Sequence, residues 1–200
     1  MEKPFSQACE NNKKLILAII ADYFEQSKLV LEIGSGTGQH ASYFARKMPH
    51  LFWQTSDQLI YQEGINLRVN EYTKYNLGRP MTLDVTQSRW PIENCDGIFT
   101  ANTSHIMNQQ MVDDMFIGAS NILTSESFFC LYGPFKFDGK FTSKSNEDFD
   151  QWLKGRDPES GIRDFERLEE LALDQQLNFV KRFDMPANNC ILVWQKNRHK

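Results

Sequence analysis

The segment at residues 28–38 reads KLVLEIGSGTG, an apolar run that ends in three closely spaced glycines. The apolar part, residues 28–33, predicts a buried strand, and residues 38–47 predict the helix that follows it. Glycines let the backbone turn tightly and approach a ligand, to which the start of a helix presents free N–H groups. A tight turn that binds nothing is the alternative. The segment therefore predicts a strand–loop–helix unit with a candidate binding loop at residues 34–38.

The rest of the chain alternates short strands with helices. Strands are predicted at residues 52–55, 81–85, 97–101, 127–132, 179–183 and 190–194, and helices at 10–26, 58–75, 111–122 and after the capping Asp164. No helix separates the last two strands, so the pattern predicts a doubly wound α/β fold. Its mostly parallel seven-stranded sheet would have an antiparallel last strand at its edge. Residues 1–200 are expected to form a single domain, in which the irregular segment 133–163 is a lid or substrate-binding insertion.

Composition excludes several classes of function. The net charge is −4, and the one basic cluster, Lys196, Arg198 and Lys200, is expected to be a solvated chain end rather than a nucleic-acid face. The longest apolar run has seven residues against about 20 for a membrane span. The cysteines form no CxxC pair and no histidines have metal-ligand spacing, so we expect no metal and a cytoplasmic protein. Residues 146–174 hold ten acidic and four basic residues, which favours a neutral or cationic substrate.

The residues around the glycines indicate which ligand the loop binds. A dinucleotide-binding loop of the type G-x-G-x-x-G would need a glycine where Gln39 stands. Glu32 precedes the loop, where its carboxylate would repel a pyrophosphate but attract the ammonium group of S-adenosylmethionine. Both residues argue against a nucleotide-dependent oxidoreductase and favour S-adenosylmethionine.

Two further carboxylates follow predicted strands. Asp57 would accept hydrogen bonds from the ribose hydroxyls, and Asp84 from the adenine amino group, while the N–H of Val85 donates to a ring nitrogen. Each acid alone is an ordinary strand-end residue. Together with the glycine loop they predict a complete cofactor site.

Polar residues also follow the fourth predicted strand, beginning at Asn102. His105 is a candidate general base, with a cap or buttress of the next helix as the alternative. His40 is either a ligand contact or a packing residue. Tyr132, at the end of the fifth predicted strand, is the second catalytic candidate.

At this point the sequence resembles the class I S-adenosylmethionine-dependent methyltransferases, through residues 32–38, Asp57 and Asp84. More narrowly it resembles the methyltransferase-like protein 26 family, a domain of unknown function. The strings that carry this resemblance are GTGQHA at 36–41, LDVT at 83–86, YGPF at 132–135, RDPE at 156–159, GIRD at 161–164 and DMPANN at 184–189. The resemblance implies the seven-stranded methyltransferase fold and S-adenosylmethionine as cofactor. Asn11 and Leu15 stand where the family usually has arginine and proline.

The predicted function is in-line methyl transfer to an unidentified acceptor, a small molecule rather than a nucleic acid or a membrane, leaving S-adenosylhomocysteine. A catalytically silent S-adenosylmethionine-binding adaptor is the alternative. The predicted cofactor residues are Glu32, Gly34, Ser35, Gly36, Gly38, His40, Asp57, Asp84, Val85 and Asn102, and the predicted catalytic residues are His105 and Tyr132. The predicted acceptor residues are Asn12, Phe135, Asn146, Asp148, Phe149, Arg163, Asn188 and Asn189. For an acid such as Asp148, a solvated position is the alternative.

Overall fold

The structure, a computed structural model, describes residues 2–198 and alternates strands with helices as expected. The helices are α1 (Gln7–Tyr23), α2 (Gln39–Lys47), α3 (Gln62–Glu71), α4 (Gln109–Ile122), α5 (Lys144–Arg156) and α6 (Phe165–Asp174), with short 3-10 helices η1 (Leu59–Tyr61) and η2 (Pro186–Asn188). The strands are β1 (Leu29–Ile33), β2 (Phe52–Asp57), β3 (Leu77–Thr82), β4 (Cys95–Ala101), β5 (Leu123–Gly133), β6 (Phe135–Phe137), β7 (Lys140–Phe141), β8 (Arg163–Asp164), β9 (Leu177–Met185) and β10 (Asn189–Lys196).

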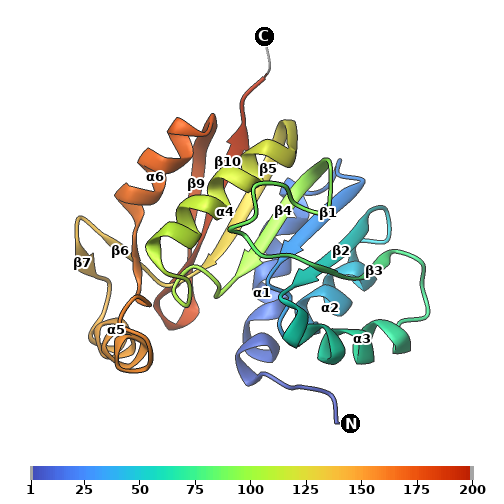
Figure 1. Cartoon of the computed structure of the whole chain (residues 1–200), viewed down its shortest axis with the longest axis horizontal. Helices are drawn as coiled ribbons and strands as arrows, with labels where there is room; N and C mark the ends of the chain where they lie inside the picture. The colour runs from blue at the N-terminus through green and yellow to red at the C-terminus, as the bar shows by residue number, and fades with distance from the viewer. Residues whose placement is uncertain (1, 199–200) are drawn as a thin grey trace.

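Seven strands form the main sheet in the order β3-β2-β1-β4-β5-β10-β9 (Figure 1). Strands β1 to β5 are parallel, and β10 is antiparallel to both of its neighbours. The predicted fold class is confirmed, but the antiparallel strand is not at the edge. Residues 190–194 of β10 are buried throughout, whereas most of β9 is exposed or half-buried, so β9 takes the edge and β10 the interior.

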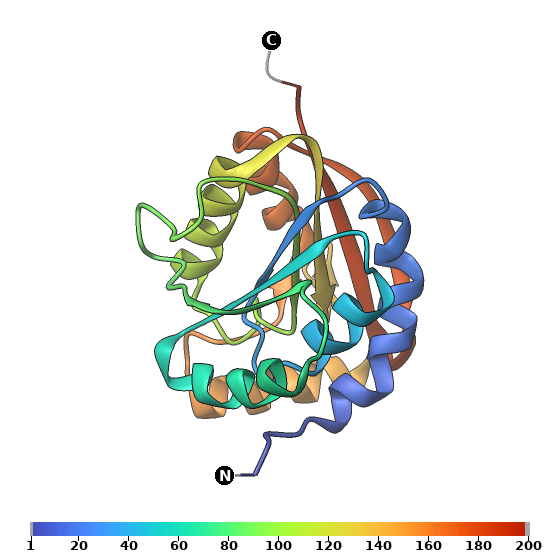
Figure 2. The same ribbon diagram turned by 90° about the vertical axis from the view of Figure 1, so that its right-hand side faces the viewer.

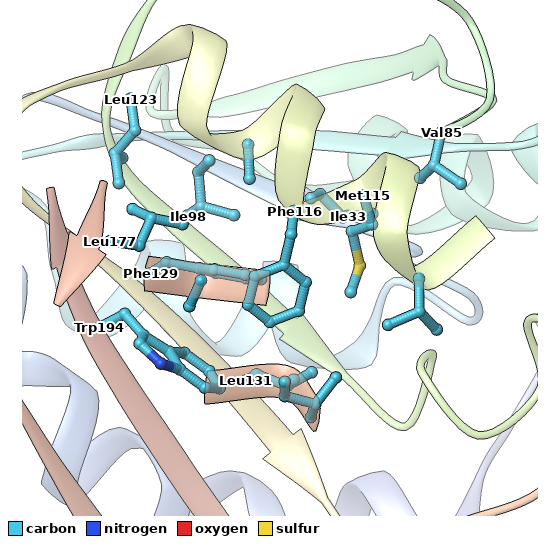
Figure 3. Close-up of a cluster of buried hydrophobic side chains, with 14 of the residues drawn as sticks. Ile33, Val85, Ile98, Met115, Phe116, Leu123, Phe129, Leu131, Leu177 and Trp194 are labelled. Atoms are coloured by element: carbon cyan, nitrogen blue, oxygen red, sulfur yellow. The ribbon is translucent and has the colours of Figure 1, made fainter. Parts of the chain in front are cut away.

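Successive side chains of a strand point to opposite faces, and each face of this sheet carries its own core. Leu31 packs with residues of α4 and α6 on one face. Ile33 and Phe129 belong to the same cluster, and Figure 3 shows them beside α4. Val30 and Phe99 pack with α1 and α2 on the other face. Figure 2 views the sheet from its edge, with the blue helix α1 on one side and the yellow-green helix α4 on the other. The two faces make the three-layer arrangement of helix, sheet and helix.

The third strand, β3, begins and ends earlier than the predicted residues 81–85. Pro80 lies within it, which an edge strand tolerates because the missing N–H faces no neighbouring strand. The apolar pattern at Leu83 and Val85 reflects burial of a turn, not a strand. Asp84 therefore does not end a strand.

Residues 133–163 are ordered and not irregular, contrary to the prediction. Strands β6, β7 and β8 form a second small sheet, and α5 follows it. Ser143 caps α5 by accepting a hydrogen bond from the N–H of Asn146, and ion pairs one turn apart support the helix. Asp164 is the residue before α6, as predicted, but its side chain makes no capping hydrogen bond.

The carboxyl ends of the parallel strands lie along the lower edge of the sheet in Figure 1, beside α5 and the segment that precedes α1. The two structural features that the sequence places near a ligand, the glycine loop and residues 102–105, follow β1 and β4 at this edge. None of the helices in residues 2–198 is both long and apolar enough to cross a membrane.

Candidate active site

The glycine loop after β1 needs glycine for two different reasons. Gly34, Gly36 and Gly38 all have positive φ, at 71°, 55° and 71°. A Cβ on Gly34 would lie 2.5 Å from Cγ2 of Thr103, so the loop packs directly against the end of β4. A Cβ on Gly36 would meet nothing within 4 Å. The loop is therefore closed on the side of Thr103 and open above Gly36, as a ligand cradle requires.

Asp57 is the last residue of β2, as predicted, and faces the same loop. Its Oδ2 accepts the N–H of Gly36 at 2.7 Å, and its Oδ1 accepts the N–H of Gln58 at 2.8 Å. Burial raises the pKa of Asp57, and these two hydrogen bonds oppose the rise. A carboxylate has about four acceptor positions, so Asp57 can still accept hydroxyl groups of a ribose.

Glu32 lies beneath the loop rather than in the open space above it. It is 2% exposed, and its Oε2 accepts the indole N–H of Trp53 at 3.2 Å. Burial raises the pKa of Glu32 to about 7, although interactions with Ser35 and Trp53 lower it. The carboxyl group is thus partly protonated at neutral pH, and a nearby ammonium group would favour its ionised form. The direct contact with a ligand ammonium stays a prediction.

The turn that follows β3 lies beside the end of β2, since the N–H of Leu83 donates to the carbonyl of Asp57 at 3.1 Å. Asp84 uses its Oδ1 to accept the N–H and the hydroxyl of Thr86, at 3.0 and 2.8 Å. Val85 is buried. Asp84 therefore braces this turn and keeps its second oxygen available, and its contact with adenine stays a prediction.

A cavity of about 500 Å³ opens at the carboxyl ends of β4 and β5, and Asn102 in its wall is the neighbour of Thr103, against which Gly34 packs. The predicted residues that line it are Asn12, Asn102, His105, Tyr132, Asn146, Phe149 and Asn189. They come from α1, from the segment after β4, from β5, from α5 and from β10. The tertiary structure thus brings both predicted catalytic residues into one pocket with several of the predicted acceptor residues.

His105 is buried in the wall of this cavity. Burial, together with the positive charge of Arg163, lowers the pKa of His105 to about 4, so its ring is neutral at pH 7. Its Nδ1 is a buried atom with no hydrogen-bond partner within residues 2–198. It faces Gly133, where a Cβ would lie 3.9 Å from Nδ1, an ordinary contact distance. The capping role considered for His105 belongs to Asn108, whose side chain accepts the N–H of Met111.

Ring contacts hold His105 in place on the side of α5. Phe149 meets the imidazole edge-on, with ring centroids 5.2 Å apart, and stacks on Trp152. Tyr132 is buried, which raises its pKa, while a side-chain hydrogen bond with Asn12 lowers it. Both titratable side chains of the cavity wall are therefore neutral at pH 7.

His40 does not line the cavity, although it was predicted to contact the cofactor. It is buried and stacked on Phe44, with ring centroids 5.3 Å apart. Its Nε2 lies 2.7 Å from Oδ1 of Asn12. His40 thus contacts Asn12, which lines the cavity, and does not line the cavity itself.

Four predicted acceptor residues do not line the cavity. Phe135 is 1% exposed and belongs to the core under α4, because its strand turns inward. Asp148 lies on the solvent side of α5, paired with Lys144 at 2.9 Å. Arg163 donates to the carbonyl groups of Ser104, Met107 and Glu159. Asn188 supports the wall through its carbonyl, which accepts from Asn146 at 2.9 Å.

Several lining residues escaped prediction as site residues. They are Ser6, Ala8, Asn11, Leu15, Pro134, Met185, Pro186 and Ala187. Most come from the first turns of α1 and from η2, where no strand end or glycine loop marks a site. One signal was present in the sequence: Asn11 and Leu15, noted as departures from a related family, both lie in this wall.

Comparison with known proteins agrees with this architecture. A family model described as "Protein of unknown function (DUF938)" matches residues 3–196. An O-methyltransferase family protein from Burkholderia thailandensis is similar over 96% of this chain and 58% of its own, with 11% identity and a TM-score of 0.84. The S-adenosylmethionine-dependent methyltransferase SibL in its apo form is similar over 96% of this chain and 56% of its own, with 17% identity and a TM-score of 0.80.

A third similar structure is human N-acetylserotonin methyltransferase in complex with S-adenosylmethionine, over 96% of this chain and 53% of its own, with 11% identity and a TM-score of 0.79. This chain therefore spans between 53% and 58% of the length of these three structures. At such low identity the likeness concerns the fold, which is the Rossmann-like fold of class I methyltransferases.

Proposed function

The chain belongs to the family described as "Protein of unknown function (DUF938)", and from its own site we propose that it transfers a methyl group from S-adenosylmethionine to a small-molecule acceptor. One observation carries the proposal. Gly34 of the cofactor-type loop packs against Thr103, and the same short segment supplies Asn102 and His105 to the cavity. A methyl donor on the loop and an acceptor in the cavity would therefore be neighbours.

The residues present suit this cofactor. The open space above Gly36, the spare acceptor positions of Asp57 and the buried carboxyl group of Glu32 offer room, hydroxyl acceptors and a negative charge. Ser35, Gly38, Asn102, and Asp84 with Val85 complete the proposed cofactor set. When bound, S-adenosylmethionine supplies an electrophilic methyl group on a sulfonium ion.

The side chains of the cavity would align the acceptor and manage its proton. We assign in-line attack by an acceptor nitrogen, oxygen or sulfur, because alignment in a dry site supplies much of the acceleration of such a displacement. His105 lines the cavity and is neutral at pH 7, so we assign to its ring the proton that the nucleophile releases as it is methylated. Phe149 and Tyr132 bring aromatic surface to the same wall.

Two narrower points belong to the same proposal. A cavity of about 500 Å³ next to an unpartnered imidazole favours catalysis over a silent adaptor, which would need neither. The narrower resemblance to the methyltransferase-like protein 26 family is supported by residues 184–189, one of its strings, because η2 and its flanking residues form part of the cavity wall.

Calorimetry tests the cofactor half. The wild-type protein is expected to bind S-adenosylmethionine and S-adenosylhomocysteine but not NAD. Asp57→Asn keeps an oxygen for the N–H of Gly36 but loses a charged acceptor for ribose, so affinity should fall about tenfold or more. Asp148→Asn is the matched control, since that carboxylate lies in solvent and should leave the affinity unchanged. Binding of NAD alone would overturn the proposal.

Transfer of a labelled methyl group tests the catalytic half. A panel of small-molecule acceptors and a small-molecule cell extract are incubated with labelled S-adenosylmethionine and the protein. Label should appear in a small molecule, and His105→Ala should slow its appearance without weakening binding of S-adenosylhomocysteine. Tight cofactor binding without any transfer would instead support the adaptor.

A further inference from the structure

Resting on the proposed methyl transfer, we propose that the acceptor is an uncharged, ring-containing molecule that donates an N–H or O–H group to the amide oxygens of Asn146 and Asn189. The basis is the chemistry of the cavity wall, which combines apolar surfaces with carboxamides and carries no formal charge. This assignment goes beyond the methyl-transfer activity, which any nucleophilic acceptor could satisfy.

Among residues 2–198, neither a carboxylate nor a basic side chain of lysine or arginine lines the wall. The titratable groups that these described residues bring to the wall are His105 and Tyr132. Burial lowers the pKa of His105 to about 4 and raises that of Tyr132, so both are neutral at pH 7. Arg163 acts on His105 through its positive charge, but it does not line the cavity and donates to three backbone carbonyl groups. An ionic acceptor would therefore find no counter-charge in direct contact.

The charged residues next to the wall in sequence have partners elsewhere. Glu10 pairs with Lys13 at 2.5 Å, and both flank the lining asparagines of α1. Asp150 pairs with Lys154 at 2.6 Å and also accepts the N–H of Ile162 at 2.7 Å. The acid-rich segment 146–174 thus does not make the cavity acidic, and the preference for a cationic acceptor drawn from its composition does not apply to this wall.

Desolvation then decides between charged and uncharged acceptors. A charged group that leaves water for an apolar site without an ion-pair partner loses its hydration without compensation, whereas an uncharged polar group needs only a hydrogen bond. Carboxamides provide that hydrogen bond at little cost. The cavity is therefore selective for neutral molecules.

The carboxamides of Asn146 and Asn189 use their N–H groups within the protein and keep their oxygens for a ligand. Both hydrogens of the Asn146 amide are taken, by Oγ1 of Thr142 at 2.8 Å and by the carbonyl of Asn188 at 2.9 Å. The Asn189 amide likewise donates to the carbonyl groups of Pro186 and Ala187, both at 3.3 Å. Each side chain keeps its Oδ1 without a partner among residues 2–198, so this end of the cavity accepts hydrogen bonds and calls for a donor.

The remaining wall is apolar and partly aromatic. Leu15, Pro134, Phe149 and Met185 line it, and Phe149 presents a ring fixed by His105 on one side and Trp152 on the other. A volume of about 500 Å³ lies in the range of small-molecule sites. A flat ring system with one donor group matches both the shape and the polarity.

Three probes with one skeleton test the charge preference: 6-hydroxy-2-naphthamide, 6-hydroxy-2-naphthoate and 6-(aminomethyl)-2-naphthol. Binding is measured by calorimetry with excess S-adenosylhomocysteine at pH 7.5. The neutral amide should bind about tenfold more tightly than the anion and the cation. Its N,N-dimethyl derivative, which lacks the amide N–H, should bind several-fold more weakly. Tighter or equal binding of either ion, or no binding of any probe at millimolar concentration, would overturn the proposal.

A substitution in the wall provides the matched control. Leu15 is 46% exposed, so Leu15→Arg should fold and place a cation at the cavity mouth. The preference of this variant should shift about tenfold toward the naphthoate, whereas Leu15→Gln should keep the wild-type order. An unchanged order in Leu15→Arg would contradict the assignment. If the protein did not bind S-adenosylhomocysteine, the proposed cofactor would be contradicted. The proposed acceptor class would still be tested, because binding of the probes reports on the cavity itself.

Discussion

The ring nitrogen Nε2 of His40 lies 2.7 Å from the amide oxygen Oδ1 of Asn12, and both side chains are buried. Burial lowers the pKa of His40 to about 4, so the ring is neutral at pH 7. Because an amide oxygen only accepts, Nε2 carries the hydrogen and donates it. The amide N–H of Asn12 then donates to the hydroxyl of Tyr132, which leaves the phenolic hydrogen for a ligand in the cavity.

Asn12→Leu should therefore destabilise the protein and weaken acceptor binding together. The N–H of His40 would lose its buried partner, which costs about 1–3 kcal/mol of unfolding free energy, measured by urea unfolding. Binding of 6-hydroxy-2-naphthamide should weaken, while affinity for S-adenosylhomocysteine stays unchanged. Asn11→Leu is the control, because Asn11 lines the same cavity but is exposed and does not contact His40. Equal losses of stability in both variants would contradict the chain of hydrogen bonds from His40 through Asn12 to Tyr132.

Glu32→Gln should make the protein more stable at alkaline pH. The folded-state pKa of Glu32 is about 7 against an ordinary value of 4.5, so the folded protein keeps a proton that the unfolded chain releases between these values. This group therefore lowers stability by about 3 kcal/mol as the pH rises from 4.5 to 7. Glutamine keeps an oxygen for the indole of Trp53 and does not ionise.

Thermal unfolding of both proteins at pH 5 and pH 8 measures this effect. The advantage of Glu32→Gln should be large at pH 8 and small at pH 5, since His40 and His105 titrate alike in both proteins and cancel in the comparison. The variant should also bind S-adenosylmethionine more weakly, because it lacks the negative charge. A difference in stability that is the same at both pH values would refute a raised pKa for Glu32.

Gly34→Ala should cost more stability than Gly36→Ala, although both glycines have positive φ. Alanine at 36 bears only the backbone strain, about 1–2 kcal/mol, whereas alanine at 34 also clashes with Cγ2 of Thr103. Thr103→Ser removes that methyl group and keeps the hydroxyl that lies 2.6 Å from the hydroxyl of Thr100. In the serine background, the cost of Gly34→Ala should fall toward that of Gly36→Ala in urea unfolding. Strict additivity in this double-mutant cycle would exclude the clash.

Arg163 should lower the pKa of His105 through its positive charge, in addition to any effect of its hydrogen bonds on the position of His105. Its guanidinium group donates to the carbonyl of Ser104 at 2.9 Å, next to His105, and its positive charge contributes to the lowered pKa of that histidine. Arg163→Met removes the charge and Arg163→Lys keeps it. The pKa of His105, followed by NMR of its ring protons, should be higher in the methionine variant than in the lysine variant. The same pKa in both would leave burial as the only cause.

The glycine loop and the position of Asp57 could be predicted from the sequence because the residues that indicate them are neighbours in the chain. Three glycines within five residues, an apolar run before them and an acid at the next strand end all predict structure over short segments. Asp57 was placed correctly for this reason. The error at Asp84 has a local cause as well, since alternating apolar residues predict burial but do not distinguish a strand from a buried turn.

The acceptor half depends on contacts between distant segments. Phe135 and Asp148 had suitable chemistry and a suitable position in the chain, but the turn of β6 buries the first and the outer face of α5 exposes the second. Ala8 and Ala187 carry no sequence signal of a site. They line one cavity because α1 and η2 both contribute to the wall at the carboxyl ends of β4 and β5.

By itself, then, the sequence determined the doubly wound sheet, the glycine loop and the carboxylate at the end of β2, since periodicity and glycine placement act through neighbours in the chain. Only the tertiary structure decided that His40 contacts Asn12, that Glu32 is buried, and that the acid-rich segment contributes no charged side chain to the cavity wall. Burial and pairing set these properties, and both depend on segments that are separate in the chain, such as α1 with Asn12, α2 with His40 and β5 with Tyr132.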